Sequence, residues 1–248
     1  MKALVISPHP DDETLGCGGS IAALTNAGCD VFVMCVACHD FNTGPDGWAR
    51  DANREAEFKE ACGALGVTDC EVLLHPDVRD DLTASTSRII YAIETGSRLS
   101  IDSISPDLVF LPVASSVHQD HRVVHAAALS ACRLREPGRP RPLGILGYRG
   151  PDDLCFAYAE QMTLFIDTSQ RQDSKHRALG SYKYQMKPYP HPRSFTAIEA
   201  IDRMNGLSNG VECAEVFTPY RLSLLIGSSG RSATSVVKPS SPVPGPPG

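Results

Sequence analysis

Residues 2–13 read KALVISPHPDDE, an apolar run that passes directly into a histidine between two prolines and then into three carboxylates. The run over 2–7 has the length and continuous apolar character of a strand that is buried on both faces. A helix pattern over 18–27 and a second apolar run over 30–37 follow it, which predicts a β-α-β unit with parallel strands and a right-handed crossover. The histidine and carboxylates therefore fall at the end of the first strand, where open α/β sheets place their sites.

The alternation of strand and helix patterns continues through the first half of the chain. Further strands are expected over 71–74 and 107–112, and helices over 54–65 and 83–99. Short apolar strands separated by helices are typical of a doubly wound sheet. The predicted fold class is therefore α/β, a three-layer α/β/α sandwich built on a Rossmann-like, mostly parallel sheet.

After about residue 140 the pattern becomes less regular. We expect this part to pack on the sheet and to help wall the site, with strands over 143–147, 154–157, 162–166 and 221–226 and helices over 174–184 and 195–204. From residue 228 the chain is rich in Ser, Gly and Pro, which bury too little apolar surface to offset the entropy lost on ordering. The sequence thus predicts one domain over 1–227 and a disordered tail over 228–248.

Composition limits the classes of partner. With 248 residues, 42% of them hydrophobic, the chain can bury one large core. A formal net charge of −6 provides no basic field for nucleic acid or for an anionic membrane surface. The first residues lead into a strand rather than a signal peptide, and no apolar run approaches the ~20 residues of a membrane span. We expect a cytoplasmic protein without a nucleic-acid partner or a membrane span; a homo-oligomer stays open.

The nine cysteines are scattered, and their number is odd. Cys35 and Cys38 form a CxxC pair, but it ends a strand pattern and has no second pair to complete a zinc-thiolate cluster. A redox CxxC more often opens a helix, where the dipole lowers the thiol pKa. Buried free thiols in a reducing compartment therefore fit the pattern better.

Two polar motifs carry the candidate chemistry. In the first, His9 and Asp12 are separated by two residues at a strand-to-helix junction, so one turn can aim both side chains at a single point. His121 from the second motif completes a set of two imidazoles and one carboxylate, typical of catalytic zinc sites that leave a position for water. Asp11 must point elsewhere and is the candidate to hydrogen-bond that water. Acidic residues that merely begin a helix are the alternative, but they do not account for a histidine between two prolines.

The second motif, His118-Gln119-Asp120-His121, follows the apolar run 108–111 and opens an Ala-rich helix pattern. His118 precedes this helix and can reach a reacting group, and Asp120 is expected to hold its imidazole in one tautomer. His125 lies four residues after His121 and could share its helix face. Within the surrounding apolar run, however, a core histidine satisfied by its neighbours is the more common finding.

As a pair, the P-H-P-D-D-E run after an N-terminal strand and the H-Q-D-H motif after a later strand resemble the LmbE/PIG-L family of zinc-dependent N-deacetylases. Supporting matches extend the resemblance to about residue 222, among them L-G-C-G-G at 15–19, Arg54 with Glu57, and Ala214-Glu215-x-Phe217. The chain carries no tyrosine just before the second motif, where several members have one. An assisting tyrosine would have to come from elsewhere, for example Tyr148.

The resemblance assigns each motif residue a role. The metal ligands it implies are His9, Asp12 and His121, holding Zn²⁺ or alternatively Fe²⁺. The catalytic groups it implies are Asp11 as general base, His118 as the group that stabilises the oxyanion and protonates the departing amine, and Asp120 as the residue that orients His118.

The resemblance also implies an activity, the metal-dependent hydrolysis of the N-acetyl amide of an N-acetylglucosamine-type conjugate to acetate and a free amine. The small-molecule partner would be an amino sugar. Two alternatives are a deacylase of another amide-bearing glycoconjugate or secondary metabolite, and a non-catalytic sugar- or nucleotide-binding module on the same fold. The second would be expected to lack Asp11 or a metal ligand, and all of these residues are present.

Residues that would bind the substrate are less determined. The stretch 40–50 leaves the second strand on the expected side of the site, so Trp48 could stack on a sugar face and Arg54 could meet a hydroxyl or a phosphate. Packing and ordinary ion pairing are the competing explanations. The glycines at 16, 18 and 19 do not form the GxGxxG fingerprint, which disfavours a dehydrogenase and points instead to close helix packing.

Overall fold

The computed structural model describes residues 1–38, 42–44, 47–49, 53–74, 82–154 and 161–223. Its strands are β1 (Lys2–Ser7), β2 (Asp30–Ala37), β3 (Asn42–Gly44), β4 (Gly47–Ala49), β5 (Asp69–Leu74), β6 (Leu108–Pro112), β7 (Gly144–Tyr148), β8 (Leu164–Asp167) and β9 (Ala214–Leu222). Its longer helices are α1 (Asp12–Asn26), α2 (Arg54–Ala64), α3 (Thr86–Tyr91), α5 (Gln119–Ala131), α6 (Gln172–Ser181) and α7 (Phe195–Asn209). Its short helical turns are η1 (Ala92–Gly96), α4 (Ile101–Ile104), η2 (Pro151–Asp153) and η3 (Ser169–Arg171).

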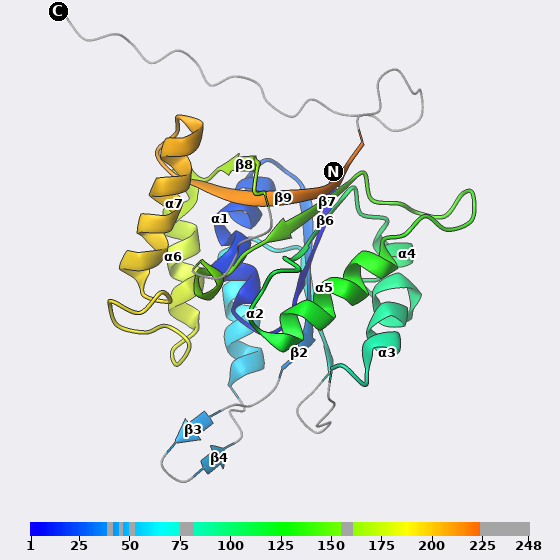
Figure 1. Cartoon of the computed structure of the whole chain (residues 1–248), viewed down its shortest axis with the longest axis horizontal. Coiled ribbons are helices and arrows are strands. Elements are labelled where there is room, and N and C mark those ends of the chain that lie inside the picture. Colours follow the sequence, from blue (N-terminus) through cyan, green and yellow to red (C-terminus); the bar gives the residue numbers. More distant parts are fainter. Residues whose placement is uncertain (39–41, 45–46, 50–52, 75–81, 155–160, 224–248) are drawn as a thin grey trace, which may run out of the picture.

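A seven-stranded sheet in the order β5-β2-β1-β6-β7-β9-β8 forms the middle layer (Figure 1). Strands β5, β2, β1, β6 and β7 pair with one another in parallel, and β9 pairs antiparallel with both β7 and β8. The mostly parallel sheet of the sequence prediction is therefore confirmed. The chain proceeds outward from β1 to β5 and then returns to the other side of β1 at β6, so the strand order reverses between β1 and β6. Crevices at such a switch point are where α/β sheets bind ligands.

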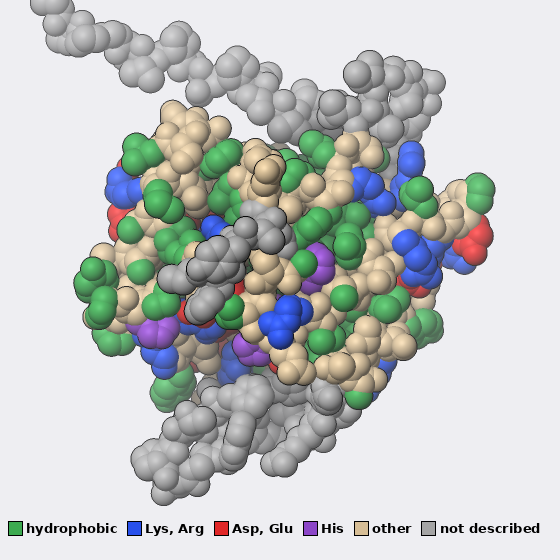
Figure 2. All heavy atoms as spheres, viewed as in Figure 1, with side chains coloured by type: hydrophobic (Ala, Val, Ile, Leu, Met, Phe, Trp, Pro, Cys, Tyr) green, Lys and Arg blue, Asp and Glu red, His purple; other side chains and the backbone are tan. Residues whose placement is uncertain are grey.

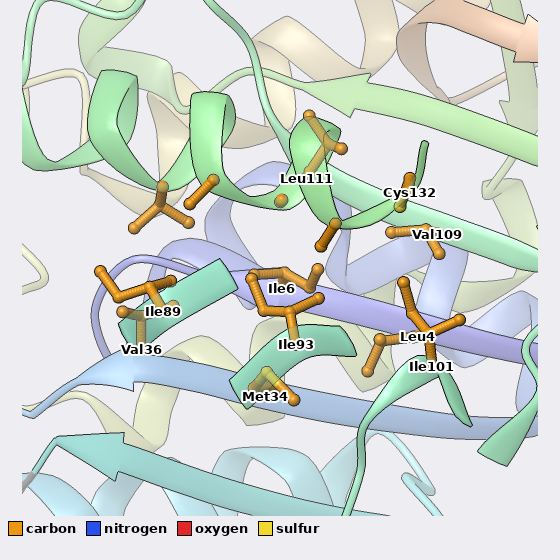
Figure 3. Packing of buried hydrophobic residues seen from close by; sticks show 14 of the residues in the cluster. Leu4, Ile6, Met34, Val36, Ile89, Ile93, Ile101, Val109, Leu111 and Cys132 are labelled. Carbon is orange, nitrogen blue, oxygen red and sulfur yellow. The ribbon is translucent and has the colours of Figure 1, made fainter. Parts of the chain in front are cut away.

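Helices cover both faces of the sheet. The side chains of β1 are therefore apolar on both faces of the strand. Leu4 and Ile6 belong to the core cluster on the side of α3 and α5 (Figure 3). Ala3 and Val5 belong to the cluster on the side of α1, α2 and α6. Successive strand residues point to opposite faces, so a strand between two helical layers needs apolar residues throughout. The three-layer sandwich is confirmed.

Several predicted boundaries are wrong. The helix expected over 83–99 is shorter and irregular: α3 passes into the π-helical turn η1, which ends at Gly96, and α4 begins only at Ile101, beyond the expected end. The last strand was expected over 221–226 but spans Ala214–Leu222. The sequence pattern hides its first part, because a proline such as Pro219 argues against a strand interior. The structure accommodates Pro219 at an irregularity in the β7–β9 pairing. The expected strand over 154–157 follows η2, and residues 155–157 lie outside the described residues.

Helix α1 begins at Asp12, six residues before the helix pattern in the sequence, and is kinked at Cys17, whose φ is −151°. Glycines around the kink weaken the helix signal. They also allow close packing, because a Cβ on Gly16 would lie 2.2 Å from Cδ2 of Tyr148. The packing explanation for this glycine segment thus agrees with the structure.

The remaining global expectations are tested only in part. The predicted tail over 228–248 lies outside the described residues, so the single domain over 1–227 stays a prediction. Among the helices that the structure describes, none is long and apolar enough to cross a membrane. The eight cysteines in the described part are free, and six of them are buried, as predicted.

A buried ion network ties α1, α6 and α7 to β9. Lys175 Nζ lies 2.7 Å from Asp202 Oδ2 and 2.8 Å from Glu215 Oε1. Glu215 also accepts hydrogen bonds from the backbone N–H groups of Gly19 and Ser20, at 2.9 and 2.7 Å, just after the kink in α1. Burial alone would lower the pKa of Lys175, but the charges of Asp202 and Glu215 raise it above its ordinary value.

Replacing Lys175 by methionine is expected to lower the free energy of unfolding by about 3–5 kcal/mol, because it leaves two buried carboxylates without their cation. Urea denaturation measures this change. Lys59→Met is the matched control, since Lys59 pairs with Glu55 on the surface and its side chain is 60% exposed. Its expected change is within about 0.5 kcal/mol. Equal losses in the two variants would contradict the assignment of a buried network.

Candidate metal centre

A tight turn after β1 brings His9 and Asp12 together. The Asp12 N–H donates to the His9 carbonyl at 3.4 Å, and the His9 N–H donates to Asp12 Oδ2 at 3.0 Å. Asp11, the third residue of this turn, has φ 110° and ψ −32°. Its carbonyl accepts the N–H groups of Thr14 and Leu15, so α1 starts immediately after the turn. The two ligand candidates of the first motif thus stand at the two ends of one turn.

The second motif opens α5. His118 is the N-cap residue of this helix, and its Nδ1 accepts the backbone N–H of Asp120 at 3.2 Å. His121 lies in the first helical turn and is 8% exposed. Because β1 and β6 pair side by side, the segments that follow them meet at the same edge of the sheet.

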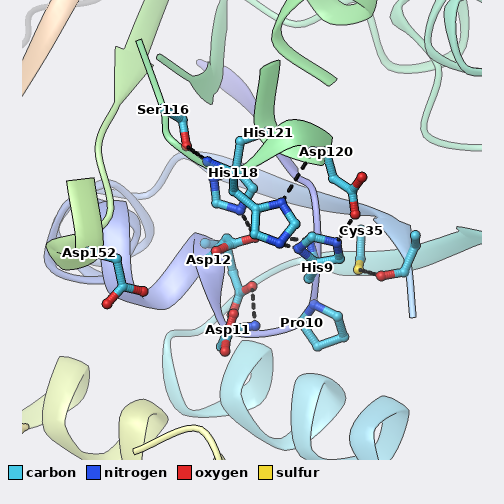
Figure 4. Close-up of polar contacts among 12 residues, drawn as sticks. His9, Pro10, Asp11, Asp12, Cys35, Ser116, His118, Asp120, His121 and Asp152 are labelled. Atoms are coloured by element: carbon cyan, nitrogen blue, oxygen red, sulfur yellow. Dashed lines mark hydrogen bonds and ion pairs between the residues drawn. The ribbon is translucent and has the colours of Figure 1, made fainter. Parts of the chain in front are cut away.

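The two motifs converge on one point (Figure 4). Asp12 Oδ2 lies 3.2 Å from His121 Nε2 and 3.5 Å from His9 Nδ1. The ligand atoms of these three residues all lie within 4.8 Å of one another, and all three residues are buried. The charges of the two histidines outweigh the effect of burial and hold the pKa of Asp12 well below its usual value. Two imidazoles and an ionised carboxylate at this spacing fit a divalent cation.

His9 presents its other ring nitrogen to Asp120, whose Oδ2 lies 3.0 Å from Nε2. His9, His118 and Asp120 form a second group whose ligand atoms are mutually close. A carboxylate behind a ligating histidine is a common way to fix the orientation of its ring. The structure therefore places the Asp120 carboxylate against His9 and the Asp120 backbone N–H against His118. The predicted role of Asp120 in orienting His118 stays a prediction.

Asp11 is 3% exposed and lies beside the ligand candidates. Its Oδ2 is 3.0 Å from Nη1 of Arg193, and Nε of Arg193 forms a salt bridge with Asp152. Burial, followed by the charge of Asp12, raises the pKa of Asp11 to about 6, while the guanidiniums of Arg193 and Arg54 act in the opposite direction. Sequence reasoning missed Arg193, because it comes from the segment between α6 and α7 and no local motif marks it.

His118 is more open to solvent than the ligand candidates. Its hydrogen bond from the Asp120 N–H requires an unprotonated Nδ1, so the neutral ring carries its proton on Nε2. Partial burial and the neighbouring imidazoles of His9 and His121 lower the pKa of His118. The ring centroids of His118 and His121 are 5.0 Å apart. Figure 2 shows histidine side chains at the surface near the middle of this face, beside side chains of Lys or Arg.

The other residues singled out in the sequence have varied positions. Arg54 is 7% exposed, and its Nη2 donates to the Pro10 carbonyl at 2.9 Å. Trp48 lies on β4, and its side chain is outside the described part of the structure.

Tyr148 is buried and its hydroxyl donates to the Ile6 carbonyl at 3.0 Å, so the structure places it in the core rather than at the site. His125 Nδ1 lies 2.8 Å from the Pro112 carbonyl, as expected of a satisfied core histidine.

Comparisons with known proteins agree with this geometry. A family model described as PIG-L, GlcNAc-PI de-N-acetylase, matches residues 4–132, slightly more than half of the chain. The chain is 32% identical over 149 residues to the uncharacterized deacetylase YaiS of Escherichia coli, covering 60% of this chain and 73% of that protein. It is 29% identical over 192 residues to the diacetylchitobiose deacetylase of Thermococcus kodakarensis, covering 74% and 70%.

Among solved structures, the conserved protein TT1542 from Thermus thermophilus matches with a TM-score of 0.69 and 25% identity, covering 92% of this chain and 99% of that one. The segment matched by the family model contains both the turn with His9 and Asp12 and the start of α5 with His118 and His121. The resemblance noted from the two motifs is confirmed: the chain belongs to the PIG-L family of deacetylases.

Proposed function

We propose that this protein is a metal-dependent hydrolase that removes the N-acetyl group of an N-acetylglucosamine-type amino-sugar conjugate and releases acetate and a free amine. The observation that carries the proposal is the convergence of His9, Asp12 and His121, with the Asp11 carboxylate beside them. The class of substrate is supported by the relatives, since the enzyme of Thermococcus kodakarensis is a diacetylchitobiose deacetylase.

The metal ion would be held by His9, Asp12 and His121, and zinc suits this set of ligands, although iron(II) could also take it. When present, such an ion acts as a Lewis acid that makes water more acidic and polarises a carbonyl group. Asp120 keeps the ring of His9 oriented through its contact with Nε2.

Asp11 and His118 supply the proton chemistry. Asp11 takes the proton of the attacking water as general base, and Arg193 pairs with one oxygen of its carboxylate. The Nε2–H of His118 donates a hydrogen bond to the carbonyl oxygen of the acetyl group as that oxygen gains negative charge. The family resemblance implies that His118 also protonates the departing amine, a step for which its ring is in the imidazolium form.

Metal analysis of the purified protein, followed by an assay of acetate release, tests the proposal. The panel contains N,N'-diacetylchitobiose, N-acetylglucosaminyl conjugates and acylated analogues that lack the sugar, each with and without a chelator. We expect about one metal ion per chain, acetate release from at least one acetylated amino sugar, and loss of release after chelation. Turnover of only the sugar-free amides would favour a different deacylase. Sugar binding without any turnover would indicate a non-catalytic module.

A further inference from the structure

The peptide bond between Pro10 and Asp11 has a buried polar side chain on each side, that of Arg54 and that of Glu13. Nη2 of Arg54 donates to the Pro10 carbonyl oxygen at 2.9 Å. The Asp11 N–H donates to Glu13 Oε2 at 3.2 Å. Arg54 is 7% exposed and Glu13 is 0% exposed. The two hydrogen bonds hold this peptide in one orientation, and the one from the Arg54 guanidinium is strengthened by its charge.

That orientation is unfavourable for Asp11 by itself. With φ 110°, Asp11 occupies the third position of a turn in which glycine is the usual residue. Positive φ at a residue other than glycine is strained and persists only where the surroundings impose it. Turning the peptide over by half a rotation would bring φ of Asp11 to about −70°, an ordinary helical value. The same rotation would point the Pro10 carbonyl at the Glu13 carboxylate and the Asp11 N–H at the Arg54 guanidinium. The rotation would therefore break both hydrogen bonds, and the contact between the Asp11 N–H and the Arg54 guanidinium would be repulsive.

Glu13 is itself anchored from another part of the fold. Its Oε1 accepts hydrogen bonds from Thr14 Oγ1 at 2.6 Å and from the hydroxyl of Tyr182, which follows α6. Tyr182 is 1% exposed. The carboxylate therefore uses both oxygens, one toward Tyr182 and Thr14 and the other toward the Asp11 N–H. The packing of α6 beside α1 thus sets the position of the group that holds the turn.

We infer that Arg54, Glu13 and Tyr182 are positioning residues that keep the turn from His9 to Asp12 in the form with Asp11 at positive φ. The inference rests on the proposed function, in which Asp11 is the base and the two ends of the turn hold the ion. Release of the peptide would reorient the backbone of Asp11 relative to His9 and Asp12. A displacement of about 1 Å at a catalytic group can lower a rate by about 100-fold.

This role for Arg54 differs in its kinetics from a contact with the substrate. Removal of a substrate contact raises KM and leaves kcat nearly unchanged, whereas loss of a positioning group lowers kcat. We expect Arg54→Met to lower kcat on the order of 10–100-fold with KM within about twofold. Arg54→Lys is expected to recover most of the rate, because an ammonium group can still donate to the Pro10 carbonyl.

Glu13→Gln tests the other side of the peptide. The Asp11 N–H and the Tyr182 hydroxyl reach different oxygens of Glu13, and glutamine has an NH2 donor in place of one of them, so one of the two hydrogen bonds is lost. We expect a loss of kcat similar to that of Arg54→Met. The double variant is expected to lose little more than the worse single variant, because both changes release the same peptide.

Tyr182→Phe removes only a hydroxyl and provides a milder test if Glu13→Gln does not fold. The matched control is Arg98→Met, since Arg98 also donates to a backbone carbonyl, that of Cys70 on β5.

Crystal structures of Arg54→Met and of the double variant give a readout that needs no substrate. We expect the Pro10–Asp11 peptide to be turned over in the double variant, with φ of Asp11 negative. A positive φ in the double variant would overturn the inference, and so would an Arg54→Met variant whose KM alone is raised. Because the backbone can be examined even if no acetylated sugar is turned over, failure of the proposed function and failure of this inference are distinguishable.

Discussion

Asp11→Asn is expected to lower kcat for acetate release by about 10²- to 10⁴-fold, the usual contribution of a general base, while the protein keeps its metal. The side chain lies beside the ligands but is held by Arg193, so its loss removes a proton acceptor rather than a ligand. Asparagine is the informative replacement, because it tolerates positive φ better than alanine does. Alanine at this position would combine the loss of the base with strain in the turn.

Steady-state kinetics and metal analysis of the same preparation check this expectation. Asp173→Asn is a matched control, because Asp173 is an exposed acidic residue in the first turn of α6. The control is expected to keep its rate. A rate near that of the parent protein for Asp11→Asn, with the metal retained, would rule out Asp11 as the base.

His121→Gln is expected to abolish tight metal binding and, with it, turnover. His121 supplies one of the three atoms that converge within 4.8 Å. Loss of an outer partner of a metal site typically lowers affinity by 10- to 100-fold, so loss of a direct ligand should lower it further. Competition with a coloured chelator measures the affinity, and elemental analysis after dialysis measures the amount of metal that remains.

His125→Gln is the control for this experiment, since His125 lies one helical turn beyond His121 and contacts the Pro112 carbonyl. The control is expected to bind about one ion per chain, as the parent protein does. If His121→Gln bound metal as tightly as the control, the proposed ligand set would be wrong.

Both polar motifs were identified in the sequence because each is local. His9 and Asp12 are three positions apart at the end of a strand, and His118 and His121 bracket the start of a helix. The parallel order of β1 and β6 followed from the β-α alternation, so the meeting of the two motifs at one sheet edge was a reasonable expectation. Boundaries were predicted less well where glycines or a proline mask the pattern, as at the start of α1 and in β9.

Contacts around Asp11 could not be predicted in this way. Arg193 is 182 residues from Asp11 in the chain, and Tyr182 is 169 residues from Glu13. Each pair depends on the position of the segments around α6, which no local pattern specifies. Arg54 was predicted to contact the substrate, and only the structure shows that it donates to the Pro10 carbonyl.

The sequence by itself determined the α/β class, the order of the first strands and helices, and the candidate metal ligands at 9, 12 and 121, because these features arise from short-range periodicity and spacing. Tertiary structure alone decided how Asp11 is oriented. Its positive φ opposes local preference, and the polar groups that contact this turn come from α2, the end of α6 and the segment before α7, which meet there only when the helices have packed on the sheet.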